Sequence, residues 1–347
     1  MIKKYSKSFQ DILKLKENFF TEDNKLASDS IVLANKYKQQ EKRTTCKNCS
    51  FPLEKNPLFN KQGIDYFLCS NCNHLNGGFE DSEEYVRDVY VDEITNYSNF
   101  YIEKNKKTYW ERVEKIYKPK VLFLLECLHD IHIDPSDLLF SEIGAGAGYF
   151  LSALKGELPD SSMIGYEVSS RQVALANNML GKELVNNIQI DKLIDLIRME
   201  EADVLVMIGV LEHLSNPREV LNEIVKNNRI KFFYLSVPLF SFSVFFELIN
   251  QGHFNRQLSG GHTHLYTRES IEYFCKEFGF CVAGEWQFGA DVMDLFRFIY
   301  LEMEKVGANK GAKDYFSNKF VPILDQLQEV LDKTDFSSEI HLLLMKK

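Results

Sequence analysis

The 347-residue sequence lacks a hydrophobic run long enough to cross a membrane. A transmembrane helix needs roughly 18–20 apolar residues, and the longest candidate, residues 232–249, is interrupted by Pro238, several serines and Glu247. A signal peptide is also missing, because the basic residues 1–5 are not followed by an apolar core. These absences predict a cytoplasmic protein without a membrane span.

The sequence has no excess of basic charge. It contains 41 basic and 50 acidic residues, which gives a formal net charge of −9. Phosphate contacts dominate the binding of nucleic acids, so this balance disfavours a nucleic acid as partner, although a local basic patch stays compatible with it. The length allows two or three structural units and a sizeable core.

Three of the 18 glycines alternate within one short segment. Residues 141–151 read S-E-I-G-A-G-A-G-Y-F-L, in which Gly144, Gly146 and Gly148 follow the acidic Glu142 at alternate positions. This order predicts a strand, a tight glycine turn and the start of a helix, which is where α/β folds bind nucleotides. For three glycines alone, an ordinary strand-to-helix turn is the alternative interpretation.

A second acidic residue follows at an informative distance. Glu167 ends the short apolar run 163–167 and stands 19 positions after Gly148, where a carboxylate can accept both ribose hydroxyls of a nucleoside. A dinucleotide-binding dehydrogenase has similar spacing, but its pattern is G-x-G-x-x-G rather than G-x-G-x-G. Glu142 would also repel a pyrophosphate at this turn, and the turn lies in the middle of the chain.

These residues resemble the class I S-adenosylmethionine-dependent methyltransferases, from about Ser141 to the C-terminus. A third segment, residues 202–217, is similar to the fourth strand of that family and to the Leu-Glu-His turn after it. The resemblance implies an α/β fold with a Rossmann-like sheet of seven strands, and S-adenosylmethionine as cofactor. It places the methionine part of the cofactor on the glycine loop and the ribose on the acid after the second strand. The implied cofactor-binding residues are Glu142, Gly144, Gly146, Gly148, Glu167 and Gly209.

Four of the seven cysteines form two C-x-x-C pairs. Cys46 and Cys49 are separated by nineteen residues from Cys69 and Cys72, and a strand is expected at 64–68. This spacing is a strong signature of a zinc ribbon in which four thiolates hold a structural Zn²⁺. A redox-active pair and unligated cysteines are the alternatives, and His74 is a possible replacement ligand.

Histidine supplies the candidate bases, since its pKa lies near neutrality. His262 and His264 flank one threonine and form a polar cluster with Tyr266, while His213 follows the fourth strand and His253 lies upstream. Each histidine alone is more often structural than catalytic. The predicted catalytic residues are His262, His264, Tyr266 and His213.

A zinc unit in front of such a domain is similar to the sugar C-methyltransferases that act on nucleotide-linked deoxysugars. Their motif resembling H-x-x-Y-F-S aligns with residues 262–267, which implies that His262 is the catalytic histidine. The Tyr and Glu that accompany that histidine in the family are replaced here by Ser259 and Gly261. O-methylation of a sugar therefore fits as well as C-methylation.

The chain is expected to comprise a helical lead-in at 1–45, the zinc ribbon at 46–79, a helical and aromatic segment that partly covers the site at 80–135, and the methyltransferase domain at 136–347. Insertions are expected at 238–265 and 291–336, and strands at 138–143, 163–167, 183–188, 203–209, 231–237, 280–283 and 339–345. The leading hypothesis is a methyltransferase for a sugar, nucleotide sugar or glycan precursor. An RNA or other small-molecule methyltransferase, and a non-catalytic cofactor-binding protein, are the alternatives.

Overall fold

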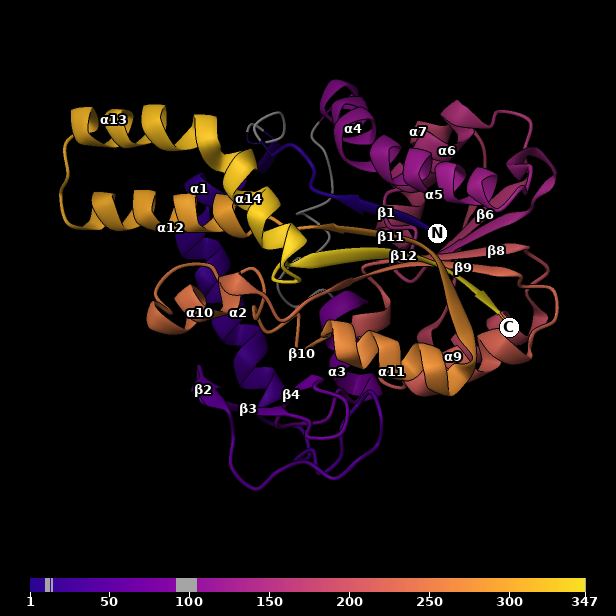
Figure 1. Cartoon of the computed structure of the whole chain (residues 1–347), viewed down its shortest axis with the longest axis horizontal. Coiled ribbons are helices and arrows are strands. Elements are labelled where there is room, and N and C mark those ends of the chain that lie inside the picture. Colours follow the sequence, from indigo (N-terminus) through magenta and orange to yellow (C-terminus); the bar gives the residue numbers. More distant parts are fainter. Residues whose placement is uncertain (10–12, 14, 92–104, 347) are drawn as a thin grey trace.

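The computed structural model describes residues 1–9, 13, 15–91 and 105–346. Its centre is an eight-stranded, mostly parallel sheet with the order β1-β11-β12-β9-β8-β5-β6-β7 (Figure 1). The strands are β1 (Ile2–Tyr5), β5 (Phe140–Ile143), β6 (Met163–Glu167), β7 (Val185–Asn187), β8 (Val204–Ile208), β9 (Phe232–Pro238), β11 (Phe280–Phe288) and β12 (Glu339–Lys346).

Seven of these strands follow the segments expected from the sequence. The parallel strands β5, β8 and β9 are buried along nearly their whole length, which explains their continuous apolar runs. Strand β12 runs antiparallel between β9 and β11, with Leu342 opposite Leu235 and Glu285. The α/β prediction is therefore confirmed.

The prediction of seven strands was wrong, because the N-terminus adds an eighth. Strand β1 pairs parallel with β11, from Ile2 opposite Gly284 to Tyr5 opposite Gln287. Its sequence, I-K-K-Y, is too short and too rich in lysine to be identified as a strand, yet charged side chains are common on edge strands. Lys4 Nζ lies 4.5 Å from the centre of the Trp286 ring, and the Trp286 indole donates a hydrogen bond of 2.9 Å to the Ser6 carbonyl.

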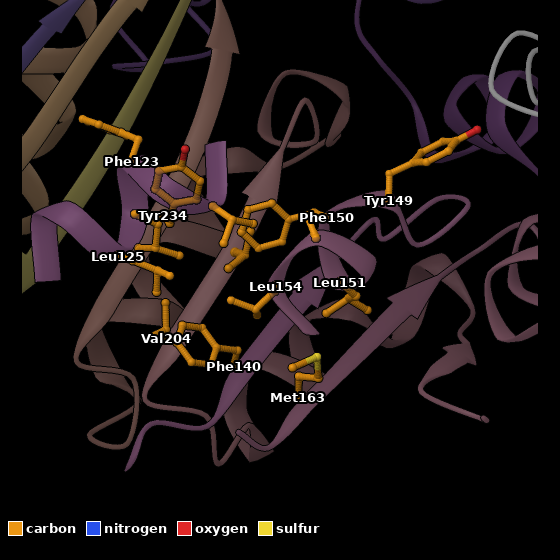
Figure 2. Close-up of a cluster of buried hydrophobic side chains, with 14 of the residues drawn as sticks. Phe123, Leu125, Phe140, Tyr149, Phe150, Leu151, Leu154, Met163, Val204 and Tyr234 are labelled. Atoms are coloured by element: carbon orange, nitrogen blue, oxygen red, sulfur yellow. The ribbon is translucent and has the colours of Figure 1, made fainter. Parts of the chain in front are cut away.

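Helices cover both faces of the sheet. Helices α4 to α7 lie on one face in Figure 1, and α9 and α11 lie on the other. Buried apolar side chains from β5, β8, β9, α5 and α6 form the larger core, in which Phe123, Phe140, Phe150 and Tyr234 pack (Figure 2). The helices of these two layers are α4 (Lys106–Arg112), the π-helical turn Val113–Tyr117, α5 (Lys118–Asp130), α6 (Tyr149–Glu157), α7 (Ser170–Leu180), α8 (Leu193–Met199), α9 (Pro217–Lys226) and α11 (Arg268–Phe278).

A second, antiparallel sheet lies below the large sheet in Figure 1. Its order is β10-β4-β3-β2, with β2 (Phe59–Lys61), β3 (Ile64–Leu68), β4 (Leu75–Gly77) and β10 (His264–Leu265). The last strand comes from a distant part of the chain, and His264 stands opposite Asn76. The small sheet is thereby joined to the segment that follows the large sheet's strand β9.

The remaining helices form a projecting group. Helices α12 (Asp291–Lys305), α13 (Lys310–Phe320) and α14 (Leu324–Lys333) extend to one side of the large sheet in Figure 1, near α1 (Asn18–Thr21), α2 (Asp23–Tyr37) and α10 (Phe242–Ile249). The buried Asp23 carboxylate ties these elements together: Arg297 Nη1 lies 2.8 Å from it and His253 Nδ1 lies 2.7 Å from it. His253, one of the candidate bases, thus belongs to an ion-pair network outside the site.

The segment between the two sheets is helical where it is described. It includes α3 (Glu83–Tyr90) and α4, while residues 92–104 of the expected covering segment lie outside the described residues. Tyr109 is fully buried and donates to the Ala147 carbonyl at 3.0 Å, whereas Trp110 is 44% exposed. Short 3-10 turns occur at Pro135–Asp137, Ile190–Lys192, Leu211–His213 and Val321–Ile323. Among the described residues, no helix combines the length and apolar character that a membrane span requires.

Candidate active site

The glycine turn between β5 and α6 has the strained backbone that its sequence predicts. Gly144, Gly146 and Gly148 have φ angles of 72°, 53° and 74°, in the left-handed region that favours glycine. A Cβ on Gly144 would lie 2.4 Å from Val210 Cγ2, so only glycine fits there. Gly144 and Gly146 line the cavity, whereas Gly148 caps α6 and approaches Ala176.

Glu167 is held in place by the glycine turn itself. Its Oε2 accepts a hydrogen bond of 2.9 Å from the Gly146 amide, and its Oε1 accepts one of 2.8 Å from the Ser169 amide. The carboxylate is 7% exposed and lines the cavity at the end of β6. This is the position at which a carboxylate can bind the ribose of a nucleoside.

Glu142 brings a second carboxylate to the floor of the same cavity. It is buried, and its Oε2 has no hydrogen-bond partner among the described residues. Burial, together with the charge of Glu167, raises the pKa of Glu142 well above its usual range. A cationic ligand would offset both causes, and S-adenosylmethionine carries a sulfonium and an ammonium group.

A cavity of about 450 Å³ joins these residues, a size within the usual range of about 300–1,000 Å³ for ligand sites. One wall consists of the turn after β8, where Gly209 has a φ of 65° and donates to Ser236 Oγ at 3.1 Å. The opposite side is formed by α4, the π-helical turn and the N-terminal segment. Five of the six predicted cofactor residues line this cavity: Glu142, Gly144, Gly146, Glu167 and Gly209.

Two of the predicted catalytic histidines meet in this cavity. The rings of His213 and His262 stack with their centres 5.2 Å apart and an angle of 19° between their planes. His262 Nδ1 lies 3.0 Å from the Gln257 carbonyl, which can only accept, so this nitrogen carries the proton and Nε2 keeps its lone pair. Burial lowers the pKa of His262 to about 4, so the ring is neutral at pH 7.

Glu212 stands beside both histidines and was not predicted as a site residue. It is 3% exposed, lines the cavity, and burial raises its pKa to about 8. Its Oε1 lies 3.8 Å from His213 Nε2, which is too long for a hydrogen bond. The Leu-Glu-His motif contained the signal for this residue, since it places an acid next to a histidine at the end of a strand.

The structure does not bring His264 or Tyr266 to the cavity. Both are buried, because β10 joins the small sheet and the chain then enters α11. His264 Nδ1 lies 2.8 Å from His74 Nε2, and His264 Nε2 lies 2.9 Å from the Glu212 carbonyl. Both nitrogens of His264 are therefore engaged in hydrogen bonds that link the small sheet to the turn of Glu212.

The four predicted metal-binding cysteines form one buried cluster. Their sulfur atoms lie within 4.8 Å of one another, with Cys46 3.7 Å from Cys72 and Cys49 3.5 Å from Cys69. Four thiolates at about 2.3 Å from one tetrahedral zinc ion would be about 3.8 Å apart, so the cluster fits such an ion closely. His74 is engaged with His264 and does not join the cluster.

Basic side chains gather at the end of the cavity formed by the N-terminal segment and α5, and the sequence analysis did not predict them. They come from segments far apart in the chain, so no local sequence motif indicates that they lie together. Burial, together with the charges of Arg112 and Arg256, lowers the pKa of Lys16 to about 7. The five basic residues that line the cavity are Lys7, Lys16, Arg112, Lys120 and Arg256.

Comparison with known proteins identifies the kind of domain that contains this site. Residues 141–228 match the protein family described as methyltransferase domain. No curated protein matches the chain. Many solved structures are similar to it, and three of them are methyltransferases with the following values. Magnesium protoporphyrin IX methyltransferase from Synechocystis PCC 6803 is 12% identical over 77% of this chain and 100% of its own, with a TM-score of 0.45.

Two other methyltransferase structures have comparable sequence identity, coverage and TM-score. Plantazolicin methyltransferase BamL is 12% identical over 75% of this chain and 94% of its own, with a TM-score of 0.46. Geranyl diphosphate C-methyltransferase from Streptomyces coelicolor A3(2) is 9% identical over 71% of this chain and 86% of its own, with a TM-score of 0.41.

The matched segment contains the glycine turn, Glu167, and the turn with Glu212 and His213. It is a class I methyltransferase domain, and the chain is an enzyme that uses S-adenosylmethionine. The residues of the cavity fit this cofactor, because glycines that allow close backbone approach stand beside two buried carboxylates, which a cationic molecule would neutralise.

Proposed function

We propose that the enzyme methylates a sugar that carries a phosphate group, with a nucleotide sugar as the principal acceptor class. The observation that carries this proposal is the group of basic side chains at one end of the cavity, since cations buried in a cleft favour an anionic ligand. A diphosphate at that end would leave the sugar to extend toward the turns of His213 and His262.

The local charge balance supports an anionic acceptor. Lys120 Nζ lies 3.2 Å from Glu339, and Arg256 Nε lies 2.7 Å from the buried Asp294, so these two cations already have carboxylate partners. Lys7 donates to the Ile116 carbonyl at 3.1 Å. Among the described residues, neither Lys7 nor Lys16 has a carboxylate within ion-pair distance. An acceptor phosphate would supply the missing negative charge.

The residues of the cavity divide into two functional groups under this proposal. Gly144, Gly146 and Gly209 let the backbone approach the cofactor, and Glu142 and Glu167 bind its cationic part and its ribose. His262 and His213 lie where the acceptor hydroxyl or acidic carbon would be deprotonated, and in the protein alone the lone pair of His262 Nε2 is the proton acceptor. His264 and Tyr266 support this arrangement from outside the cavity.

Methyl transfer requires the acceptor atom in line with the methyl carbon, at about 3–3.5 Å. An electron pair of the acceptor oxygen or carbon forms the new bond to the methyl group. The bond from that carbon to sulfur breaks, its electron pair stays on sulfur, and S-adenosylhomocysteine is released. The acceptor proton is lost at the His262 end of the cavity.

We also propose that the cysteine cluster holds a structural Zn²⁺, since four buried thiolates leave no position for water or substrate. Under this proposal, the zinc ribbon comprises residues 46–79. The helical lead-in at 1–45 and the helical insertions support the cavity from both sides. Arg218 connects the ribbon to the methyltransferase domain, because its Nη1 donates to the Asn48 carbonyl at 2.6 Å.

A binding experiment tests the acceptor class. The protein saturated with S-adenosylhomocysteine is titrated by calorimetry with nucleotide sugars, with the same sugars without phosphate, and with an RNA oligonucleotide. Tight binding of a nucleotide sugar that weakens about tenfold in Lys7→Met, but not in the exposed control Lys3→Met, supports the proposal. Equal binding of the sugar without phosphate, or salt-sensitive binding of RNA alone, overturns it.

A further inference from the structure

Three side chains in the cavity bring potential metal-ligating atoms close to one another. The ligating atoms of Glu212, His213 and His262 lie within 4.8 Å of one another. Three ligands around one ion at about 2.1 Å lie about 3.4–3.6 Å apart, so the three atoms must close by up to about 1.3 Å to share one ion. His213 Nε2 and Glu212 Oε1, at 3.8 Å, already lie near this separation.

The hydrogen bonds behind the two rings orient both Nε2 atoms toward this point. His262 Nδ1 donates to the Gln257 carbonyl at 3.0 Å. His213 Nδ1 lies 2.6 Å from the Tyr90 hydroxyl, and this hydroxyl lies 3.2 Å from the Gly261 carbonyl. When the hydroxyl donates to the carbonyl, His213 Nδ1 donates to the hydroxyl, and its Nε2 keeps a lone pair. Fixing the outer nitrogen of a histidine in this way is typical of metal-binding histidines.

The carboxylate lacks a partner that would explain its burial. Glu212 is 3% exposed, and its Oε2 has no hydrogen-bond donor among the described residues. A buried carboxylate oxygen without a donor costs free energy when the group is ionised, and two neighbouring nitrogen lone pairs make that cost greater. A cation placed among the three atoms would remove both unfavourable terms.

We infer that Glu212, His213 and His262 form a second metal site, distinct from the cysteine cluster, for a divalent cation of the first transition row. Two imidazoles and one carboxylate suit such ions better than Mg²⁺ or Ca²⁺, which prefer oxygen ligands alone. Three protein ligands leave positions open toward the cavity for an acceptor hydroxyl. In the metal-loaded enzyme His262 would be a ligand rather than the base, and the ion would lower the pKa of an acceptor hydroxyl so that its proton could pass to water.

The cysteine ribbon supports this second site from behind. His264 Nε2 lies 2.9 Å from the carbonyl of Glu212 itself, and His264 is bonded through His74 to the segment that follows Cys72. The backbone of the carboxylate ligand is therefore fixed by the small sheet. The site does not depend on the identity of the acceptor, so it can be tested without any methyl transfer.

The test is the binding of Mn²⁺ to the full-length protein after its cysteine cluster has been saturated with Zn²⁺. Electron paramagnetic resonance measures free Mn²⁺, and one ion per chain with a micromolar dissociation constant is expected. Glu212→Gln and His262→Ala should each weaken binding at least tenfold, whereas the exposed-histidine control His129→Ala should not.

A folding defect is separated from loss of a ligand by two further measurements. Each variant is checked for its melting temperature and for its affinity for S-adenosylhomocysteine, which the glycine turn and Glu167 bind elsewhere in the cavity. Absence of Mn²⁺ binding to the folded wild-type protein at millimolar concentration overturns the inference. Binding that is unchanged in both folded variants overturns it as well.

Discussion

His264 Nδ1 lies 2.8 Å from His74 Nε2 in the small sheet, and the other ring nitrogen of His264 links this pair to the turn after β8 of the large sheet. On one side, His74 follows Cys72 by two positions and precedes β4. On the other side, His264 Nε2 reaches the carbonyl of Glu212 at 2.9 Å, next to His213 in the cavity. Through these two bonds, the cysteine-bearing module determines the position of the turn that carries the candidate catalytic residues.

The first prediction concerns His264. Replacing it with Ala removes the bond to the Glu212 carbonyl and leaves His74 without its buried partner, which should cost about 1–3 kcal/mol of stability. The turn should lose its fixed position, so kcat should fall at least tenfold while the affinity for S-adenosylhomocysteine changes less than threefold. Kinetics and calorimetry measure the two quantities. If kcat is retained in the folded variant, His264 has no positioning role.

The second prediction concerns the cysteine cluster. Zinc analysis of the purified protein should give one ion per chain, and Cys69→Ser should lower this content severely. Structural zinc sites contribute folding free energy directly, so the variant should lose roughly 3 kcal/mol or more of unfolding free energy. Cys281→Ser is the matched control, because Cys281 lies outside the cluster. Full stability without bound zinc would contradict the prediction.

Local patterns in the sequence were sufficient for the large sheet and for the glycine turn. Alternation of strands and helices, the positive-φ glycines and the acid at the end of β6 depend on residues close in sequence. The start of α11 also depends on residues close in sequence, since Thr267 caps this helix and forms a capping box with Ser270.

Long-range contacts were not predictable in this way. The edge strand β1 pairs with residues about 280 positions away, and β10 pairs with β4 across nearly 190 positions. His264 and Tyr266 were predicted as site residues because they lie close to His262 in sequence. Because β10 pairs with β4, both residues are buried in the interior and do not line the cavity. The basic end of the cavity was missed for a related reason, since Lys7, Lys120 and Arg256 meet only in the folded chain.

The third prediction concerns Glu167. Glu167→Gln removes the charge but keeps the shape, and because its side-chain amide has one oxygen, only one of the Gly146 and Ser169 amides keeps an acceptor. Charged hydrogen bonds to the ribose would weaken, and the dissociation constant of S-adenosylhomocysteine should rise about tenfold or more, which corresponds to at least about 1.4 kcal/mol. Calorimetry measures this change. The exposed Glu183→Gln should bind as the wild type does, and equal affinity of both variants would rule out the assigned role.

The fourth prediction concerns the pH dependence of stability. Burial raises the pKa of Asp332, whose Oδ1 accepts from Gln328 Nε2 at 2.8 Å, to about 7. The folded protein therefore binds a proton that the unfolded chain has lost between pH 4 and 7, so this residue's contribution to stability falls as the pH rises through that window. Asp332→Asn should remove this contribution.

The difference in unfolding free energy between pH 5.5 and 8 should therefore be smaller in Asp332→Asn than in the wild type, by about 2 kcal/mol. Urea unfolding at both values measures it. The exposed Asp314→Asn serves as the control and should keep the wild-type difference. An unchanged difference in Asp332→Asn would show that this carboxyl is already ionised in the folded protein at pH 5.5.

The fifth prediction concerns Lys16. Burial and the neighbouring arginines lower its pKa to about 7, so in the protein without acceptor it loses its proton as the pH rises through neutrality. An anionic acceptor should bind more tightly at pH 6 than at pH 8.5, and Lys16→Met should weaken binding mainly at pH 6. The exposed Lys182→Met should leave this dependence intact. A loss of affinity that is equal at both pH values would contradict a titrating Lys16.

Transfer of an isotopically labelled methyl group tests the central claim most directly. The protein is incubated with S-adenosylmethionine labelled in its methyl group and with a panel of nucleotide sugars, and the products are identified by mass spectrometry. The account predicts a nucleotide sugar that gains one labelled methyl group on its sugar, together with an equal amount of S-adenosylhomocysteine, and a loss of that product in His262→Ala. Cofactor binding without transfer to any phosphorylated sugar, or transfer only to RNA or to uncharged acceptors, would contradict it.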